Sequence, residues 1–176
     1  MTQTAGPRVV LVGTMGAGKT TVGRLLADLW GVPFRDTDAD VEAAEGRSVS
    51  DIFVDSGEAA FRALESAAVE EALGMHDGVL ALGGGAVLDP STRDLLSGHR
   101  VVFLRVGLSD ASSRVGLGVS RPLLLGNVRG RIKQLIDERT PVYESVAAHV
   151  VDTDGVAVDE VVELVRAAVD SEVSRG

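Results

Sequence analysis

The sequence predicts an α/β fold in which a parallel sheet of five strands lies between two layers of helices, a three-layer α/β/α sandwich. Two observations predict it. Short runs that are apolar at successive positions alternate along the chain with longer segments whose apolar residues recur at helical spacing. Continuous apolar runs are typical of strands buried on both faces, and strands that alternate with helices form parallel sheets. The length of 176 residues is that of one domain, so residues 1–176 are expected to form a single domain.

Each expected strand or helix is a segment in which the apolar residues follow a single spacing. Strands are expected at residues 8–12, 32–35, 79–82, 100–106 and 146–151. Helices are expected at residues 18–29, 41–45, 57–75, 89–98, 109–116, 129–138 and 158–169, with a short turn near residues 48–53 that Ser48 or Ser50 could cap. Proline has no N–H and clashes with the preceding helical turn, so the segment 139–143 around Pro141 is expected to end the helix that begins at Arg129.

A glycine-rich segment joins the first strand to the first helix. Residues 13–20 read GTMGAGKT and match G-x-x-x-x-G-K-[ST] at every fixed position. Glycines let backbone N–H groups converge on an anion, and the start of the helix adds its dipole. Lys19 supplies a positive charge for the β- and γ-phosphates, and Thr20 a hydroxyl for Mg²⁺. The sequence therefore predicts a P-loop NTPase fold whose nucleoside triphosphate contacts Gly16, Ala17, Gly18, Lys19, Thr20 and Thr21.

Two carboxylates, Asp36 and Asp38, follow the second expected strand. If the strand continues, residues two apart point the same way, at the sheet edge where open α/β folds bind ligands. The alternative is an N-cap for the next helix, which would account for one aspartate but not for both. Their place one βαβ unit after the phosphate-binding loop favours a functional role.

Three other features are less specific. Three consecutive glycines, Gly83–Gly85, are entropically costly after a core strand, and we expect them where the backbone closely approaches a ligand or another segment. Residues 117–127 are flanked by glycines and carry Arg121 in the middle, which is typical of a mobile lid. Arg62 and Glu65 lie three apart on an expected helix, and this spacing alone indicates only a surface ion pair.

Composition excludes several classes of function. The formal net charge is −9, which argues against a nucleic-acid partner, while the arginines between residues 100 and 139 suit a small anionic ligand. The chain has no cysteine, which excludes disulfides, thiolate metal sites and a cysteine nucleophile. A polar first segment and the lack of a long apolar stretch favour a cytoplasmic protein with no membrane partner.

Five short motifs follow the phosphate-binding loop in the order found in shikimate kinases: DTD at 36–38, FR at 61–62, GGG at 83–85, RPLL at 121–124 and ERTPVY at 138–143. The chain resembles that family from about residue 8 to residue 153. The resemblance implies transfer of the γ-phosphoryl group of ATP to the 3-hydroxyl of shikimate, with Mg²⁺ as cofactor. It also implies an enzyme of chorismate and aromatic amino-acid biosynthesis. Separately, we expect the protein to be a monomer.

The resemblance assigns roles on the nucleotide side that spacing alone does not. Lys19 and Arg121 would be catalytic, Arg121 reaching from the lid to the phosphate in transfer. Thr20 and Asp36 would hold Mg²⁺, the aspartate through water. Arg114 would bind ATP by lying against the adenine.

On the acceptor side, the resemblance implies a base and a carboxylate clamp. Asp38 would bind the substrate hydroxyls and act as the catalytic base. Arg62 and Arg139 would grip the substrate carboxylate, so the resemblance replaces the surface ion pair that spacing indicated for Arg62. The floor of the site would be the backbone of Gly83, Gly84 and Gly85.

The sequence departs from the family after the last strand, where relatives often carry a basic residue near the adenine. This chain has the acidic segment DTDG at residues 152–155, which implies a weaker contact with the base. Two rival interpretations are another small-molecule kinase, such as a gluconate kinase, and a non-catalytic nucleotide-binding protein. The first would have no use for both arginines of the clamp, and the second no reason to keep the catalytic residues. A GTPase switch is disfavoured because the chain lacks the N-K-x-D motif.

Overall fold

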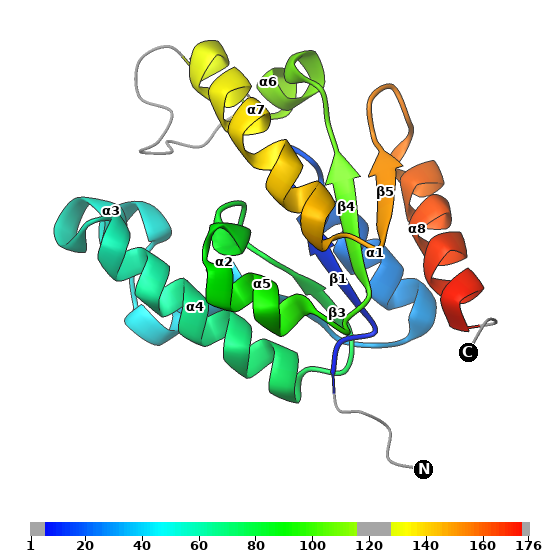
Figure 1. The fold of residues 1–176 in the computed structure, drawn as a ribbon, viewed down its shortest axis with the longest axis horizontal. Helices are drawn as coiled ribbons and strands as arrows, with labels where there is room; N and C mark the ends of the chain where they lie inside the picture. The colour runs from blue at the N-terminus through cyan, green and yellow to red at the C-terminus, as the bar shows by residue number, and fades with distance from the viewer. Residues whose placement is uncertain (1–5, 116–127, 174–176) are drawn as a thin grey trace.

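The computed structural model describes residues 6–115 and 128–173, and at its centre is one parallel sheet of five strands (Figure 1). The strands are β1 (Val9–Val12), β2 (Phe34–Asp36), β3 (Val79–Ala81), β4 (Val101–Arg105) and β5 (His149–Asp152). Their order across the sheet is β2-β3-β1-β4-β5, and every neighbouring pair is parallel. The predicted sheet is confirmed. The lid expected at residues 117–127 lies outside the described residues.

Helices connect the strands in the alternation that the sequence predicts. They are α1 (Lys19–Trp30), α2 (Thr37–Glu45), α3 (Val49–Ser56), α4 (Glu58–Met75), the 3₁₀ turn η1 (Ala86–Leu88), α5 (Pro90–Leu96), α6 (Leu108–Val115), α7 (Val128–Val146) and α8 (Val158–Val173). No helix within the described ranges is long and apolar enough to cross a membrane.

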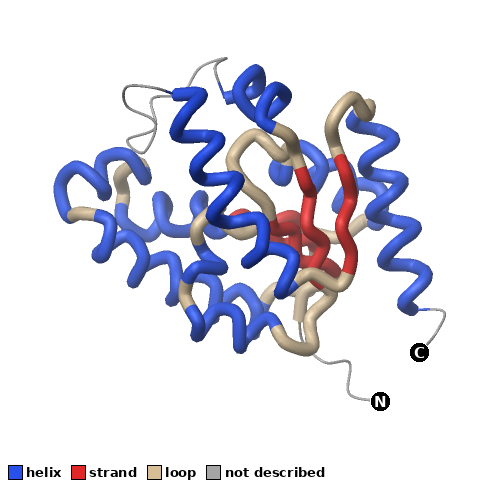
Figure 2. The backbone as a smooth tube through the Cα atoms, turned by 45° about the horizontal axis from the view of Figure 1, so that its top comes forward, coloured by secondary structure: helices blue, strands red, loops and turns tan. Residues whose placement is uncertain are grey.

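Alternate residues of β1 show which helices cover each face of the sheet. Val9 and Leu11 pack with apolar residues of α1 and α8, whereas Val10 and Val12 pack with α4, α5 and the later part of α7. Successive side chains of a strand point to opposite faces, so a strand that is apolar throughout needs a helical layer on each side. Figure 2 shows the strands between these layers. The three-layer prediction is therefore confirmed.

The helices α2, α3 and α4 have a small core of their own beside the sheet. Val41, Ile52 and Phe61 form a buried cluster, one residue from each helix. Of the two serines considered as caps, Ser48 caps α3, because its side chain accepts a hydrogen bond from the N–H of Asp51 at 3.1 Å. Figure 1 shows these helices extending away from β4 and β5.

The prediction that residues 139–143 end a helix is wrong. Helix α7 runs on through Pro141 to Val146, and β5 begins at His149 rather than at residue 146. Proline in a helix removes the N–H that would have bonded to the carbonyl of Asp137, but tertiary packing can offset that loss. Here Tyr143 is buried in the core that covers one face of the sheet, so packing keeps the last turns helical.

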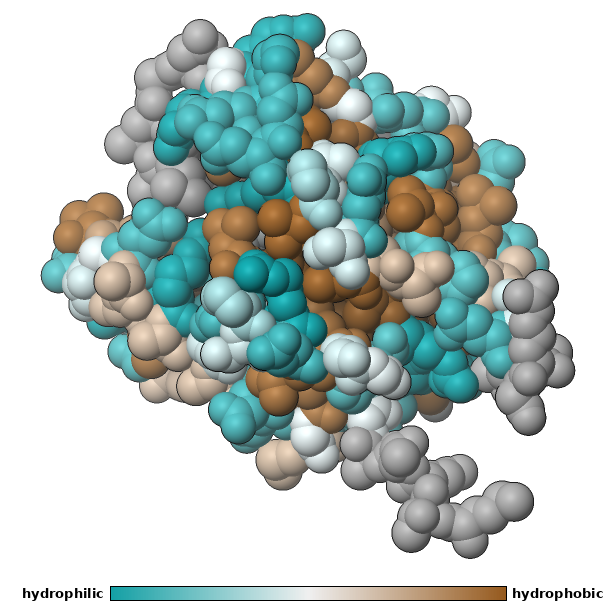
Figure 3. Space-filling model, in the orientation of Figure 1, coloured by the Kyte–Doolittle hydropathy of each residue, from teal (hydrophilic) through white to brown (hydrophobic). Residues whose placement is uncertain are grey.

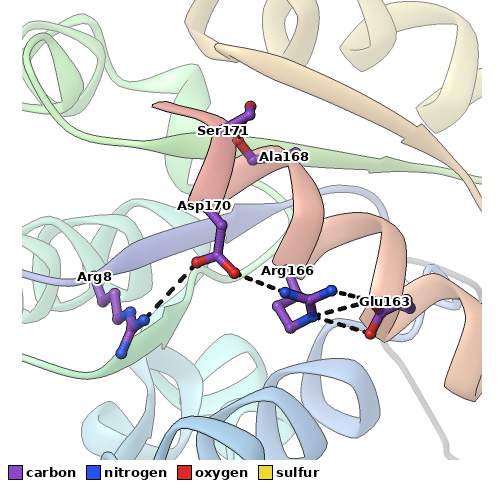
Figure 4. A network of polar contacts seen from close by, with 6 residues as sticks. All are labelled: Arg8, Glu163, Arg166, Ala168, Asp170 and Ser171. Atoms are coloured by element: carbon purple, nitrogen blue, oxygen red, sulfur yellow. Dashed lines mark hydrogen bonds and ion pairs between the residues drawn. The ribbon is translucent and has the colours of Figure 1, made fainter. Parts of the chain in front are cut away.

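A surface network joins the start of β1 to the end of α8 (Figure 4). Arg8 Nη2 lies 3.9 Å from Asp170 Oδ1, and Arg166 Nη1 donates to Asp170 Oδ2 at 2.8 Å and pairs also with Glu163. The Arg8 guanidinium also lies 4.1 Å from the centre of the Trp30 ring. On the face seen in Figure 3, apolar and hydrophilic residues are interspersed. Exposed ion pairs contribute at most about 1 kcal/mol each, so this network orients the two segments more than it stabilises them.

Candidate active site

The phosphate-binding loop connects β1 to α1 at the carboxyl end of the central strand. Gly13 has a φ of +152°, and a Cβ there would lie 2.7 Å from Leu104 O, so only glycine fits. Lys19 Nζ donates to Gly13 O at 2.7 Å and to Thr14 O at 3.2 Å, which holds the lysine across its own loop. The N-cap residue Gly18 has no side chain to cap the N–H groups at the start of α1. This is the arrangement in which a helix N-terminus binds phosphate.

Thr20 and Asp36 come together beside this loop. Thr20 Oγ1 donates to Asp36 Oδ2 at 3.2 Å, and Asp36 Oδ1 accepts from the N–H of Asp38 at 2.9 Å. The second strand therefore ends at Asp36, which is the N-cap of α2, so the alternative of an N-cap is confirmed for this residue. Because the same carboxylate also contacts the threonine of the phosphate-binding loop, its position at the cap and its place in the site are compatible.

These two side chains offer oxygen ligands of the kind that Mg²⁺ prefers. Within the described ranges, no group of three or more histidine or acidic residues could hold a metal ion alone. Mg²⁺ usually keeps several waters and uses one or two protein oxygens together with the phosphates of the substrate. A hydroxyl and a carboxylate oxygen 3.2 Å apart fit that requirement.

The loop of three glycines after β3 is surrounded by charged side chains from other elements. A Cβ at position 83 would lie 2.6 Å from Asp38 Oδ1 and 2.5 Å from Glu65 Oε2. One at position 85 would lie 2.5 Å from Arg62 Cζ, and one at position 84 would lie 3.4 Å from Arg139 Nη1. The expectation of a close approach is confirmed, and the groups that approach are side chains of the chain itself.

Arg62 and Glu65 form an ion pair inside the site rather than at the surface. Arg62 Nη1 donates to Glu65 Oε1 at 2.8 Å, and Glu65 is only 2% exposed. Burial raises the pKa of the Glu65 carboxyl, and the adjacent Arg62 guanidinium opposes that rise. The interpretation as a surface pair is wrong, because i,i+3 spacing says nothing about what covers the helix face.

Arg139 and Tyr143 approach the glycine loop from α7. Arg139 is 5% exposed and Tyr143 is 1% exposed. The Tyr143 hydroxyl donates to Gly84 O at 2.5 Å. The N–H of Gly83, one residue earlier, donates to Thr37 Oγ1 at 3.1 Å. The loop is therefore held at both of its first two residues by buried hydroxyl groups.

The carboxylates of the acidic segment at residues 152–155 form hydrogen bonds with other groups of the chain. Both carboxylate oxygens of Asp154 accept from the N–H of Gly107 at 2.8 Å, and Asp110 Oδ2 accepts from the N–H of Gly155 at 3.1 Å. Asp152 binds Arg105 through two hydrogen bonds of 2.5 and 2.8 Å, which lowers the pKa of the aspartate. These contacts fasten the loop after β4 to the loop after β5. The weaker contact with the base stays a prediction.

Comparison with known proteins identifies the family. The model of the shikimate kinase family matches residues 15–170. This chain belongs to the shikimate kinase family. A shikimate kinase of Frankia casuarinae is 60% identical over 160 residues, which cover 91% of this chain and 71% of that protein. A shikimate kinase of Thermobifida fusca is 56% identical over 159 residues, which cover 90% and 92%.

A solved structure agrees with this membership. Shikimate kinase from Acinetobacter baumannii in complex with shikimate superposes with a TM-score of 0.88 at 34% identity, over 96% of each chain. The predicted family, the fold and the class of ATP-dependent kinase are therefore confirmed. The rivals, a gluconate kinase and a non-catalytic nucleotide-binding protein, are not supported at this level of similarity.

The structure of this shikimate kinase family member brings together most of the residues that the sequence singles out. Two groups form, one at the phosphate-binding loop and one at residues 83–85. Arg121 lies outside the described residues, and so does the side chain of Arg114 on α6. Sequence reasoning gave no role to Thr37 and Tyr143, although both lie in the quoted motifs DTD and ERTPVY. No pattern in the sequence says that their hydroxyls meet the glycine loop.

Proposed function

We propose that the chain transfers the γ-phosphoryl group of ATP to the 3-hydroxyl of shikimate, giving shikimate 3-phosphate and ADP for chorismate and aromatic amino-acid biosynthesis. The observation that carries this proposal is the contact between the two glycine loops. A Cβ on Gly84 would lie 3.7 Å from Gly13 O and 3.7 Å from Met15 N, so the charged acceptor site borders the phosphate-binding loop. Phosphoryl transfer depends on placing donor and acceptor in line, so it needs binding sites for the two that adjoin one another.

The two arginines beside the glycine loop suit a substrate that carries a carboxylate. A guanidinium presents a planar fork that binds a carboxylate through two parallel hydrogen bonds. Arg62 comes from α4 and lies beside Gly85, whereas Arg139 comes from α7 and lies beside Gly84. The carboxylate is remote from the reacting oxygen. The energy with which the two arginines bind it would therefore serve to orient the hydroxyl groups of the substrate.

Asp38 is placed to act on the reacting hydroxyl. Its carboxylate lies against Gly83, and its N–H is fixed by Asp36, so the group is held by the start of α2. We propose that Asp38 binds the 3-hydroxyl and accepts its proton. The hydroxyl oxygen then bonds to the γ-phosphorus, the bond from that phosphorus to the β–γ bridging oxygen breaks, and ADP leaves.

The nucleotide side would hold ATP through the backbone of residues 16–21 and the side chain of Lys19. Thr20 and Asp36 would hold Mg²⁺, which when bound neutralises charge on the β- and γ-phosphates. Lys19 would keep the same phosphates in place as their negative charge moves towards the leaving group.

From the sequence we propose further that Arg121 acts from a lid at residues 117–127, within a single domain of residues 1–176. Arg114 would lie against the adenine. Arg121→Ala should then lower kcat more than it raises either KM, because the charge is needed most during transfer. We expect the enzyme to act as a monomer.

A panel of hydroxylated acids, including shikimate, quinate and gluconate, would test the proposed function. Each acid is incubated with ATP and Mg²⁺, ADP release is followed by a coupled assay, and the product is identified by mass spectrometry. Shikimate alone should give ADP at a high rate and a product heavier by one phosphoryl group. A stronger response to another acid, or ADP release independent of any acid, would contradict the assignment.

A further inference from the structure

The loop of three glycines leaves the sheet at a point where the neighbouring strand β2 has already ended. Successive N–H groups of a strand point to opposite neighbours. The N–H of Leu82 donates to Leu11 O of β1 at 3.1 Å, so the N–H of Gly83 points to the side of β2. The last residue pair between β2 and β3 is Asp36 with Ala81, and α2 begins at the next residue. Strand β2 therefore has no residue left to pair with Gly83.

The side chain of Thr37 supplies the acceptor that the strand no longer provides. Its Oγ1 accepts from the N–H of Gly83 at 3.1 Å, and both residues are buried. Thr37 is the first residue of α2, so this bond continues the link between β2 and β3 after the chain has turned into a helix. A buried N–H that loses its acceptor has no water to replace it, and the loop then has a reason to move.

The two neighbours of Thr37 are the aspartates of the site. Asp36 Oδ2 accepts from Thr20 Oγ1 of the phosphate-binding loop at 3.2 Å. Asp38 Oδ1 would lie 2.6 Å from a Cβ at position 83. The same short segment therefore contacts the phosphate-binding loop through Asp36 and the glycine loop through Thr37, and it carries the proposed base, Asp38, beside that glycine loop.

We propose that Thr37 is a positioning residue for phosphoryl transfer: by holding the N–H of Gly83, its hydroxyl fixes the distance between the Asp38 carboxylate and the substrate floor. The inference rests on the proposed function, because it takes Asp38 as the group that accepts the proton of the reacting hydroxyl. If this distance relaxes, the substrate still binds, but its hydroxyl is no longer aligned with both Asp38 and the γ-phosphorus. A misplacement of about 1 Å can lower a rate about 10²-fold.

The rate of transfer in Thr37→Val tests this inference, because valine has the same branched shape but no acceptor. The rate is measured in a single turnover with enzyme in excess over shikimate, so that product release does not hide the change. It should fall about tenfold to hundredfold. KM for shikimate and KM for ATP should stay within about threefold, because Arg62 and Arg139 come from other helices.

The matched control is Thr92→Val on α5. Thr92 is also buried, but in the part of the chain that the structure describes its hydroxyl has no hydrogen-bond partner. This variant makes the same change of side chain without breaking a bond, so its rate and both KM values should be those of the wild type. An equal loss of rate in the control would overturn the inference, because the loss would then come from changing any buried threonine.

The conservative variant Thr37→Ser separates positioning from packing. Serine keeps the hydroxyl and lacks the methyl group, so the rate should return to within about threefold of the wild type. A folded Thr37→Ser variant as slow as Thr37→Val would overturn the inference, and so would an unchanged rate in Thr37→Val. If Thr37→Val does not fold, Thr37→Cys replaces the hydroxyl by a weaker acceptor. Its rate should then lie below that of Thr37→Ser, and a rate equal to the wild type would overturn the inference.

Hydrogen exchange of the Gly83 amide, followed by NMR, tests the bond without using the activity. Exchange should be at least about tenfold faster in Thr37→Val than in the wild type and in Thr37→Ser. Equal exchange in all three would overturn the inference, because the hydroxyl would not be what holds the loop. A wild type that does not phosphorylate shikimate would instead contradict the proposed function, and the difference in exchange would remain, so the two failures are distinguishable.

Discussion

The two glycine loops of the site border one another but are held in different ways. The phosphate-binding loop is held by its immediate neighbourhood, since Lys19 donates to the carbonyls of Gly13 and Thr14. The loop at residues 83–85 is held from far along the chain. Thr37 lies 46 residues before Gly83, and Tyr143 lies 59 residues after Gly84.

This difference separates the part of the site that binds phosphates, as many kinases do, from the part that can be specific for one acceptor. A loop that folds by its own sequence can bind the phosphates that many kinases share. A loop surrounded by side chains of α2, α4 and α7 can instead match one acceptor, because each helix contributes groups of its own. The two loops should therefore respond independently to substitution, apart from changes that alter transfer itself.

The largest effect is expected from Lys19→Met. Loss of the charge that balances the β- and γ-phosphates should lower kcat by at least about 10²-fold, and chelation of Mg²⁺ should also abolish turnover. The affinity for shikimate, measured by calorimetry, should change little because the acceptor loop does not depend on Lys19. A variant with near-normal turnover would contradict the assignment. One that loses affinity for shikimate would show that the loops are not independent.

The next largest effect is expected from Arg62→Lys and Arg139→Lys. Lysine cannot reproduce the two parallel hydrogen bonds of a guanidinium, so KM for shikimate should rise from about tenfold to several hundredfold. KM for ATP should stay nearly constant. Shikimate amide should be a poor substrate for the wild type and no worse for the variants. If the wild type uses the amide as well as the acid, the carboxylate clamp is wrong.

A smaller effect is expected from Gly85→Ala. The added Cβ would lie 2.5 Å from Arg62 Cζ, so the flexible arginine must move away from the floor. KM for shikimate should rise about tenfold, as for the loss of one charge-assisted hydrogen bond. Gly74→Ala is the control, because nothing lies within 4 Å of a Cβ there. Equal kinetics for the two variants would mean that Arg62 need not stay close to the loop.

The smallest effect is expected on stability, through Glu65. Burial raises the pKa of this carboxyl in the folded protein above the value of 4.5 expected when it is unfolded. The folded state then binds the proton more tightly, so the free energy of unfolding should fall as pH rises from about 4.5 through the raised pKa. Compared with Glu65→Gln, the wild type should lose less than about 1.4 kcal/mol per pH unit over that window.

Urea denaturation at a series of pH values between 4.5 and 7.5 measures this difference between wild type and Glu65→Gln. If the difference in the free energy of unfolding between wild type and Glu65→Gln does not change with pH, the Glu65 carboxyl titrates in the folded protein as an exposed glutamate does. It would also mean that the Arg62 guanidinium offsets the whole cost of burial.

The same contrast explains what the sequence could predict. The phosphate-binding loop was predictable because its fold and its chemistry follow from eight consecutive residues, 13–20. At residues 83–85, composition predicted a close approach but could not name the groups that approach. Glu65 has the same i,i+3 spacing from Arg62 that an exposed pair would have, and only the packing of α4 against the glycine loop buries it.

Helix α7 shows the same limit for secondary structure. Local propensity indicates that a proline should end the helix, and that rule holds where nothing else supports the turn. The burial of Tyr143 and its hydrogen bond to Gly84 come from segments that the local sequence does not contain. Tertiary contacts therefore decided both the end of the helix and the place of a residue in the site.

The contact between Arg8 and Asp170 has a practical consequence for engineering. The side chain of Arg8, just before β1, lies 3.9 Å from that of Asp170 in the last turns of α8 (Figure 4). This contact is at the amino end of β1, whereas the site lies at the carboxyl end of that strand. A reporter fused close to either point would leave the entrance of the site clear. A circular permutant that links these two points through a short peptide would keep the strand order of the sheet intact.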